Sequence, residues 1–322
     1  MCKYKVKFLV LLLTLICFQT TKSQNALSSS ELDSLLNKAE KQSQNYVKVF
    51  QNLSAEETKT ISRYRRDGST DEKRVIKSIF VVYQSPNAAS AQEFRNVVEY
   101  NGKNVSRSDK ETAAFFAKLA KADTTKEEYA KIKEESLRYD GSRRSWGMTL
   151  YQQRPFSANL KANFKFQIAG KEKIEGRDVW VIEYEQTKPS PYILSNPTGK
   201  EEQAKGSTHY DMPISDELRP TKPLMKGKIW LDAETGQIWR NQFVIILHPA
   251  KLSRPIQASE FSYEYQLSEF AILAPKKFII RSPRINGSGD KDLTKVNDSE
   301  IVYEYAKFSE FITETKDYKI NK

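Results

Sequence analysis

His209 lies among hydroxyl and carboxylate side chains, close to Ser207, Tyr210 and Asp211. Serine, histidine and aspartate are the groups of a hydrolase triad, in which the histidine takes the proton of the nucleophile. A triad is assembled from neighbours in space, however, and consecutive residues seldom orient one another in the required way. A hydrolase is therefore the weakest of the functions weighed below, and His209 and Asp211 are its candidate residues.

The other titratable residues fit structural roles better than catalytic ones. His248 stands at a predicted strand end. The carboxylate pairs Glu183/Glu185 and Glu260/Glu264 occupy same-face strand positions, whereas glycoside hydrolysis needs two carboxylates across a cleft. No phosphate-binding glycine loop, zinc-binding histidine motif, CxxC or GxSxG motif occurs in the sequence. We therefore predict no enzyme activity, no cofactor and no metal site.

Rows of large apolar side chains are the stronger functional signal. Alternation from Ala258 to Ser268 and from Asn163 to Ile168 places such a row on one face of each predicted strand. Both rows must face the interior, because exposing them would leave a large apolar patch. A helical stripe at residues 115–119 is expected to face them. The candidate cavity-lining residues are Phe115, Phe116, Leu119, Phe164, Phe166, Ile168, Phe261, Tyr263, Tyr265 and Leu267.

Two interpretations of these rows stay open. The predicted helices can fill the space over the sheet and form a plain core, or they can leave room for an apolar ligand. Tyrosine favours the second interpretation slightly, because its ring can line an apolar pocket while its hydroxyl reaches a polar head group. A filled core would more often use leucine, isoleucine and valine at these positions.

One hairpin organises the elements that position these rows. From Lys226 to Leu247 two arms rich in β-branched and aromatic residues flank the turn cluster Asp232-Ala233-Glu234-Thr235-Gly236. Aspartate accepts backbone hydrogen bonds at the start of such a turn, and glycine takes the positive φ that closes it. Strands are also predicted at residues 77–84, 93–105, 163–168, 178–185, 258–268, 278–281 and 300–308, with Asn101-Gly102 as a second hairpin turn.

Helices are predicted at the N-terminal side of the sheet strands and between them. Apolar residues at helical spacing from Leu27 to Leu53 predict a long amphipathic helix, with a capping box from Ser28 and Glu31. Residues 108–139 predict a helical pair. Residues 186–224 hold six of the twelve prolines and predict a partly ordered flap. The predicted fold class is α+β: a strongly curved antiparallel sheet with an N-terminal helix and a helical lid on its concave side.

The first residues predict export. Three lysines precede an apolar run from Phe8 to Phe18, and small and polar residues follow. This succession is typical of a secretory signal peptide at residues 1–23, leaving a single domain at residues 24–322. Its removal takes both cysteines and leaves 48 of the 52 basic residues against 41 acidic ones, a net charge of +7. We expect a periplasmic or extracellular, envelope-associated protein, with an anionic envelope surface as a partner and no nucleic acid.

The order of these elements resembles the LolA/LolB-like lipoprotein-carrier superfamily. The resemblance extends from Leu32 to Phe311 and is carried by residues 93–103 (EFRNVVEYNGK), 135–139 (ESLRY) and 227–232 (GKIWLD), strings similar to those of uncharacterised exported bacterial proteins. It implies a half-open β-barrel with a helical lid over an apolar cavity. The chain departs from a typical carrier mainly in the excursion at residues 186–224. Its motifs are structural ones and carry no functional residue over.

Three functions follow in order. The first is a binding module for a lipid or acylated protein, held between the sheet and the lid. The alternative, nearly level with it, is a non-enzymatic envelope interaction or structural protein with a filled core. A hydrolase comes last.

Overall fold

The computed structural model describes most of the chain between residues 27 and 311. The described residues are 27–84, 91–105, 109–120, 126–141, 149, 161–189, 193–195, 208–210, 223–249, 252–286, 290–291 and 293–311. The expected signal peptide at residues 1–23 lies outside them, and the single-domain prediction stays a prediction.

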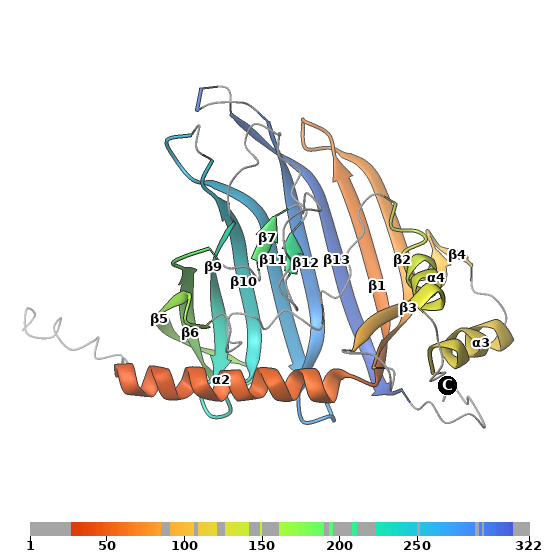
Figure 1. Cartoon of the computed structure of the whole chain (residues 1–322), viewed down its shortest axis with the longest axis horizontal. Coiled ribbons are helices and arrows are strands. Elements are labelled where there is room, and N and C mark those ends of the chain that lie inside the picture. Colours follow the sequence, from red (N-terminus) through yellow and green to blue (C-terminus); the bar gives the residue numbers. More distant parts are fainter. Residues whose placement is uncertain are drawn as a thin grey trace, which may run out of the picture.

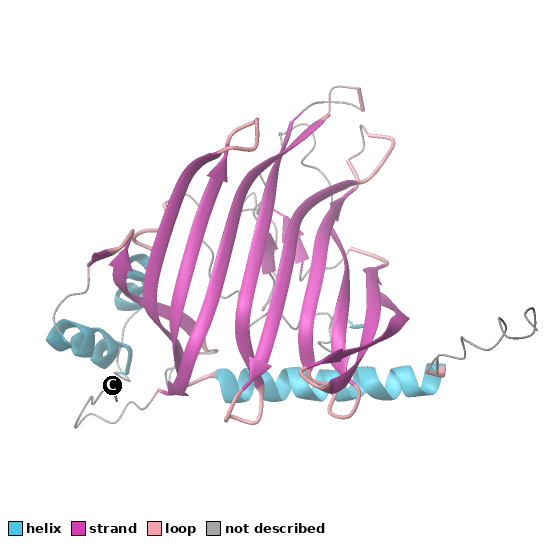
Figure 2. Cartoon of the chain, turned by 180° about the vertical axis from the view of Figure 1, so that it is seen from behind, coloured by secondary structure: helices cyan, strands magenta, loops and turns pink. Residues whose placement is uncertain are grey.

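Eleven of the described strands form one open antiparallel sheet, which curves around the face that carries the long helix α2 (Figures 1 and 2). Their spatial order is β4-β3-β2-β1-β13-β12-β11-β10-β9-β6-β5. The strands are β1 Leu53–Tyr64, β2 Thr70–Tyr83, β3 Gln92–Tyr100, β4 Lys103–Asn104, β5 Phe164–Ile174, β6 Arg177–Gln186, β9 Leu224–Asp232, β10 Ile238–Leu247, β11 Ile256–Leu267, β12 Leu273–Asn286 and β13 Thr294–Glu310. The predicted antiparallel sheet is confirmed.

The predicted central hairpin is confirmed as β9 and β10. The Oδ1 atom of Asp232 accepts hydrogen bonds from the backbone N–H groups of Glu234 and Thr235, at 3.0 and 2.8 Å. Arg177 on β6 donates from Nε to Oδ2 at 2.5 Å. Although partial burial raises the pKa of Asp232, these hydrogen bonds hold it well below its usual range. The carboxylate thus joins the hairpin turn to the neighbouring strand.

The predicted N-terminal helix is confirmed as α2, Ser29–Phe50, with the capping box between Ser28 and Glu31. Its buried stripe of Leu35, Leu36, Ala39, Ser43, Tyr46 and Phe50 follows the helical period. The helix lies across the strand ends on one face of the sheet (Figure 1). The β9–β10 turn docks against it, where the ammonium of Lys38 donates to the carbonyl of Glu234 at 3.1 Å.

The helical pair is confirmed as α3 Asp109–Ala120 and α4 Lys126–Ser136, but its expected position is wrong. Phe116, Leu119 and Ile132 pack with Val81, Tyr83 and Phe94, whereas the adjacent β2 residues Phe80 and Val82 belong to the cluster that includes α2. Successive residues of a strand point to opposite faces. The pair therefore covers the face of β2 and β3 opposite to α2.

Part of the Pro-rich excursion takes the place expected for the helical pair. Strands β7 Ile193–Ser195 and β8 Thr208–Tyr210 form a short parallel pair, which lies over the same face of the sheet as α2 in both views (Figures 1 and 2). The prediction of a flap between sheet strands agrees with these two strands, and the rest of residues 190–222 lies outside the described residues.

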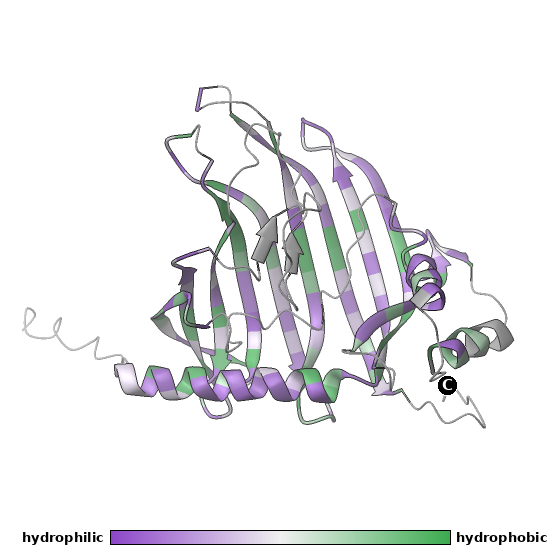
Figure 3. Ribbon diagram, viewed as in Figure 1, coloured by the Kyte–Doolittle hydropathy of each residue, from purple (hydrophilic) through white to green (hydrophobic). Residues whose placement is uncertain are grey.

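The opposite face of the central strands is polar. Cross-strand ion pairs join neighbouring strands there, such as Lys228 with Glu183 at 2.9 Å and Arg281 with Glu300 at 2.8 Å. Polar and apolar bands alternate along the strands in Figure 3. The interpretation of Glu183 and Glu260 as members of a solvated carboxylate row is consistent with this, since both carboxylates pair with lysines of adjacent strands.

The sequence-based prediction missed β1 and the first half of β2. Residues 53–64 (LSAEETKTISRY) read as polar, because two of the inward positions, Glu57 and Lys59, carry charges. Strand pairing with β13 and β2 fixes this segment over its full length. It also places the N-terminal strands beside the last strand of the chain.

Gly236 and Gly176 provide a matched test of the contact between the hairpin turn and α2. Both have positive φ, at +76° and +81°, but a Cβ at Gly236 would lie 2.8 Å from the Cβ of Lys38 and 2.9 Å from the backbone N of Ala39, whereas Gly176 has open space around it. Gly176→Ala should cost about 1–2 kcal/mol of unfolding free energy through backbone strain alone. Gly236→Ala should cost at least about 1 kcal/mol more, measured by denaturant unfolding, since α2 must shift. Equal costs would show that the turn does not depend on this contact.

Candidate functional site

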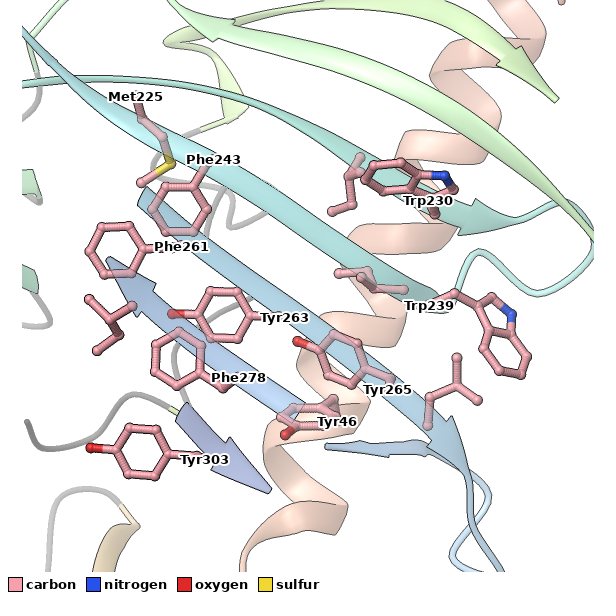
Figure 4. Close-up of a cluster of buried hydrophobic side chains, with 14 of the residues drawn as sticks. Tyr46, Met225, Trp230, Trp239, Phe243, Phe261, Tyr263, Tyr265, Phe278 and Tyr303 are labelled. Carbon is pink, nitrogen blue, oxygen red and sulfur yellow. The ribbon is translucent and has the colours of Figure 1, made fainter. Parts of the chain in front are cut away.

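A row of aromatic rings crosses the concave face of the sheet from β10 to β13. It consists of Phe243, Phe261, Tyr263, Phe278, Tyr303 and Tyr305, and is called the concave aromatic row below. Strand register places Phe243 opposite Phe261, Tyr263 opposite Phe278, and Phe278 opposite Tyr303. The ring centroids of these three pairs are 4.7, 4.1 and 5.5 Å apart with nearly parallel planes. Figure 4 shows the rings in succession.

The row ends against α2 on one side and against β2 on the other. Tyr46 of α2 meets Tyr265 edge-on at 6.2 Å between centroids, and Phe80 of β2 lies 5.3 Å from Tyr305. All six rings of the row are buried; Tyr263 is 2% exposed and Phe261 6%. A ligand that used this face would therefore have to displace what covers it.

The sequence-predicted lining residues separate into two groups. Phe261, Tyr263, Tyr265 and Phe164 are buried in the concave cluster, and Phe166 packs half-buried against it. Phe116 and Leu119, with Phe115 at the margin, belong to the cluster on the opposite face. The expected contact between the 115–119 stripe and the two strand rows is therefore wrong.

Two further lining predictions fail for reasons of position. Leu267 is 62% exposed, because it is the last residue of β11 and stands directly before the turn to β12. Ile168 is only half-buried, because β5 is the edge strand of the sheet and has a neighbour on one side only. Whether any of the predicted residues touches a ligand stays a prediction.

Five buried charged residues lie beside the tyrosine end of the concave aromatic row. They are Glu57, Lys59, Glu93, Arg95 and Asp140, called the buried charge cluster below. Glu57 and Lys59 stand opposite Tyr305 and Tyr303 in the register of β1 with β13. The cluster carries three carboxylates against two cations. Buried charges persist only when they are paired and hydrogen-bonded.

Arg95 holds two of the carboxylates. Its Nε and Nη2 atoms donate to the two oxygens of Glu57 at 2.7 and 2.9 Å, and Nη2 also reaches Glu93 at 3.3 Å. Its guanidinium carbon lies 5.0 Å from the centroid of the Phe80 ring, within the range of a cation–π contact. The Nη1 atom is buried without a hydrogen-bond partner in the structure. One guanidinium donor thus stays unused at the end of the aromatic row.

Lys59 and the chain after α4 complete the cluster. The ammonium of Lys59 donates to Asp140 at 2.6 Å and lies 5.0 Å from the Tyr303 ring centroid. The backbone N–H of Thr149 donates to Glu93 at 2.6 Å, and Tyr46 of α2 donates its hydroxyl proton to the Thr149 carbonyl at 3.2 Å. Residues 140 and 149 are therefore bound to the concave face through polar contacts.

The protonation of these groups does not suit acid–base or nucleophilic chemistry. Burial alone would lower the pKa of the Lys59 ammonium, but the charges of Tyr303 and Asp140 raise it above its ordinary value; a lysine nucleophile needs the opposite shift. Burial also acts against the charge of Arg95, yet Glu57 and Glu93 raise its pKa well above the ordinary range. Burial raises the pKa of Asp140 as well. Because Lys59 stays protonated far above neutral pH, we describe the pair as ionised.

Sequence reasoning missed this cluster, although a signal was present. Leu53, Ala55, Glu57, Lys59 and Ile61 alternate with outward-facing residues along β1. The two charged residues thus stand in register with an apolar row. A charge at an inward position of an alternating strand indicates a buried ion pair or a ligand contact.

The residues named as hydrolase candidates are not brought together in the described part of the chain. Asp211 lies outside the described residues, and only the backbone of His209 is described, in β8. His248 is exposed after β10. Among the described residues, no group of three or more histidine, cysteine, aspartate or glutamate side chains could hold a metal ion. None of the described helices is both long and apolar enough to cross a bilayer.

Comparisons with known proteins return solved structures only. No family model and no curated protein matches the chain. A DUF1329 family protein from Desulfovibrio piger is 11% identical with a TM-score of 0.34, over 88% of this chain and 94% of that one. An outer membrane lipoprotein-sorting protein domain from Vibrio parahaemolyticus is 9% identical with a TM-score of 0.33, over 86% and 92%.

A LolA superfamily protein from Nitrosomonas europaea is 11% identical with a TM-score of 0.29, over 89% of this chain and 98% of that one. The expected resemblance to LolA-like proteins is thus found among solved structures. At these identities and TM-scores, nothing about ligand or activity is transferred.

The Lys59–Asp140 pair can be tested with a double-mutant cycle. Lys59→Met should lower the unfolding free energy by about 3–5 kcal/mol, because it leaves the Asp140 carboxylate buried and uncompensated. Lys59→Met with Asp140→Leu should cost less than Lys59→Met alone, since both charges are then absent. Denaturant unfolding of the three variants and the parent measures this. Costs that simply add would show that the two groups are not coupled.

The buried lysine and tyrosines predict a loss of stability at high pH. Burial raises the pKa of Tyr303 and Tyr305, and the pKa of Lys59 is raised too. In the unfolded chain these groups lose their protons near the ordinary values of 10.0 and 10.5. Their contribution is therefore complete below about pH 10 and is lost as the pH rises through the folded values, by about 1.4 kcal/mol per pH unit and group.

Unfolding followed across this pH range by circular dichroism and by tyrosinate absorbance tests this expectation. The absorbance of the two buried tyrosines should appear together with unfolding, and Tyr303→Phe should reduce the pH slope. Tyrosinate that forms fully before any unfolding would contradict the assignment of these phenols as buried and neutral.

Proposed function

We propose that the protein is an exported carrier that binds a lipid or an acylated protein on the concave aromatic row. The observation that supports this most is the composition of that row: stacked rings on four adjacent strands, three of them phenols, ending at an unused guanidinium donor. Aromatic rings offer a large apolar surface, and phenol hydroxyls suit a ligand with one polar end. Strand-borne side chains hold such a surface rigidly.

The buried charge cluster favours a ligand with a neutral polar end. The cluster already holds three carboxylates against two cations, so a further anion would add to a negative excess. An ester or amide carbonyl, by contrast, can accept a hydrogen bond from Nη1 of Arg95 without adding charge. We therefore propose an acyl ester or acyl amide rather than a free fatty acid as the ligand.

The cover over the row is part of the proposal. Strands β7 and β8 of the Pro-rich excursion lie on the concave side together with α2 (Figure 1). They are joined to the sheet strands β6 and β9 only through residues 187–192 and 211–223. In this proposal the excursion moves aside when a ligand enters, and α2 stays in place because the hairpin turn and its buried stripe hold it.

A filled core is the second candidate, and the burial of the row favours it. Tyr303 is 1% exposed, as expected of a side chain in a packed interior. In that case the protein would be a non-enzymatic envelope interaction or structural protein that uses another surface. We propose no enzymatic activity in either case, because the buried carboxylates are engaged by Arg95 and Lys59.

Tyr263→Ala and Phe116→Ala distinguish the two candidates, because they truncate buried aromatic side chains on opposite faces of the sheet. For a carrier, the parent should take up a fluorescent acyl-ester probe. Tyr263→Ala should lose most of this uptake, while Phe116→Ala should keep it. Phe116→Ala should cost about 3–5 kcal/mol of unfolding free energy, and Tyr263→Ala clearly less.

A filled core gives a different result. Both substitutions should then cost about 3–5 kcal/mol, and the parent should show no uptake of the probe. Loss of uptake in Phe116→Ala alone would contradict the assignment of the concave row as the binding face.

A further inference from the structure

Four arginines gather at the strand ends farthest from α2. Arg63, Arg65 and Arg66 belong to the end of β1 and its turn to β2, and Arg284 comes from β12. They line a pocket of about 260 Å³ together with Asp71 and Asp298. Four guanidinium groups against two carboxylates leave this pocket with a net positive charge. Neither the concave aromatic row nor the buried charge cluster contributes to it.

The guanidinium groups are accessible and only weakly neutralised. Arg65 is 60% exposed and pairs with Asp71 at 3.1 Å, while Arg63 reaches Glu72 at 3.6 Å. Exposed pairs of this kind contribute little and exchange readily with other partners. Arg284 pairs with the buried carboxylate of Asp298. Arg66 is exposed and forms no ion pair with any described residue.

The position of the pocket suits an end-on approach to a surface. β1 begins at Leu53, just after α2, and reaches Tyr64 after eleven further residues, about 36 Å away at the rise of an extended strand. The β1–β2 turn accordingly lies at the end of the sheet remote from α2 (Figure 1). Tyr64 also lines the pocket, and tyrosine is a residue type that favours the interface between a membrane and water.

We propose that these four arginines form a docking site for the phosphate groups of an anionic phospholipid surface. The guanidinium fork matches the geometry of phosphate oxygens, and several basic residues near one surface add their attraction to anionic lipid. A single soluble anion is less suited, because Arg63, Arg65 and Arg284 are each about half exposed to solvent. The docking site brings one end of the sheet to the membrane and is independent of the ligand on the concave row.

Vesicle co-sedimentation tests the proposal with charge-matched variants of the mature chain. Arg65→Gln/Arg66→Gln removes two positive charges from the site. Lys171→Gln/Lys173→Gln removes two exposed charges from β5, at the α2 end of the sheet (Figure 1). Vesicles of phosphatidylcholine alone are compared with vesicles that contain about 30% phosphatidylglycerol, an anionic lipid.

The parent should bind the anionic vesicles and not the neutral ones, less strongly as salt rises. The arginine double variant should bind about 25-fold more weakly, at about 5-fold per charge, and the lysine double variant should bind within about 2-fold of the parent, because its charges lie several Debye lengths away. Equal losses in both variants would show diffuse attraction without a site. Full displacement by millimolar inorganic phosphate would identify a soluble anion as the ligand, and absence of parent binding would also overturn the proposal.

Discussion

The register of β10 to β13 is the constraint on which the rest of the structure depends. It sets aromatic side chains of adjacent strands directly opposite one another, with ring centroids as close as 4.1 Å, and so gives the sheet one face that must be shielded from water. The other face carries cross-strand ion pairs and can remain in contact with water. The long helix, its contact with the β9–β10 turn and the position of the Pro-rich excursion all follow from the need to cover the aromatic face.

The buried charge cluster is the exception within that face and costs stability to form. Desolvating five charged groups is unfavourable, and apolar residues of similar volume would often be at least as stable. What the cluster provides is a specific arrangement: Arg95 and Glu57 join β3 to β1, and Asp140 and Thr149 hold the chain after α4 on the concave side. It also leaves one guanidinium donor beside the tyrosines. This polar end makes the face more than a packed apolar layer.

The sequence predicted the elements better than their positions. Alternation and helical spacing were sufficient for the central hairpin, α2 and most strands, because each signal is local. β1 was missed since Glu57 and Lys59 stand where apolar residues were expected. The face chosen by α3 and α4 depends on β2, whose residues 80–83 are buried on both sides; the apolar stripe of a helix does not say which face it covers. Leu267 shows the limit of alternation, which does not indicate where a strand leaves the covered part of a sheet.

The central claim is that the concave aromatic row holds an acyl ligand with a neutral polar end. Native mass spectrometry of the protein purified from its own cell envelope tests it most directly. The account predicts, besides the apo protein, a species heavier by the mass of one acylated molecule, which exchanges for an added acyl ester and is absent in Tyr263→Ala. A single apo mass, with no uptake of added acyl esters by the parent, would contradict the account and leave the aromatic row as a filled core.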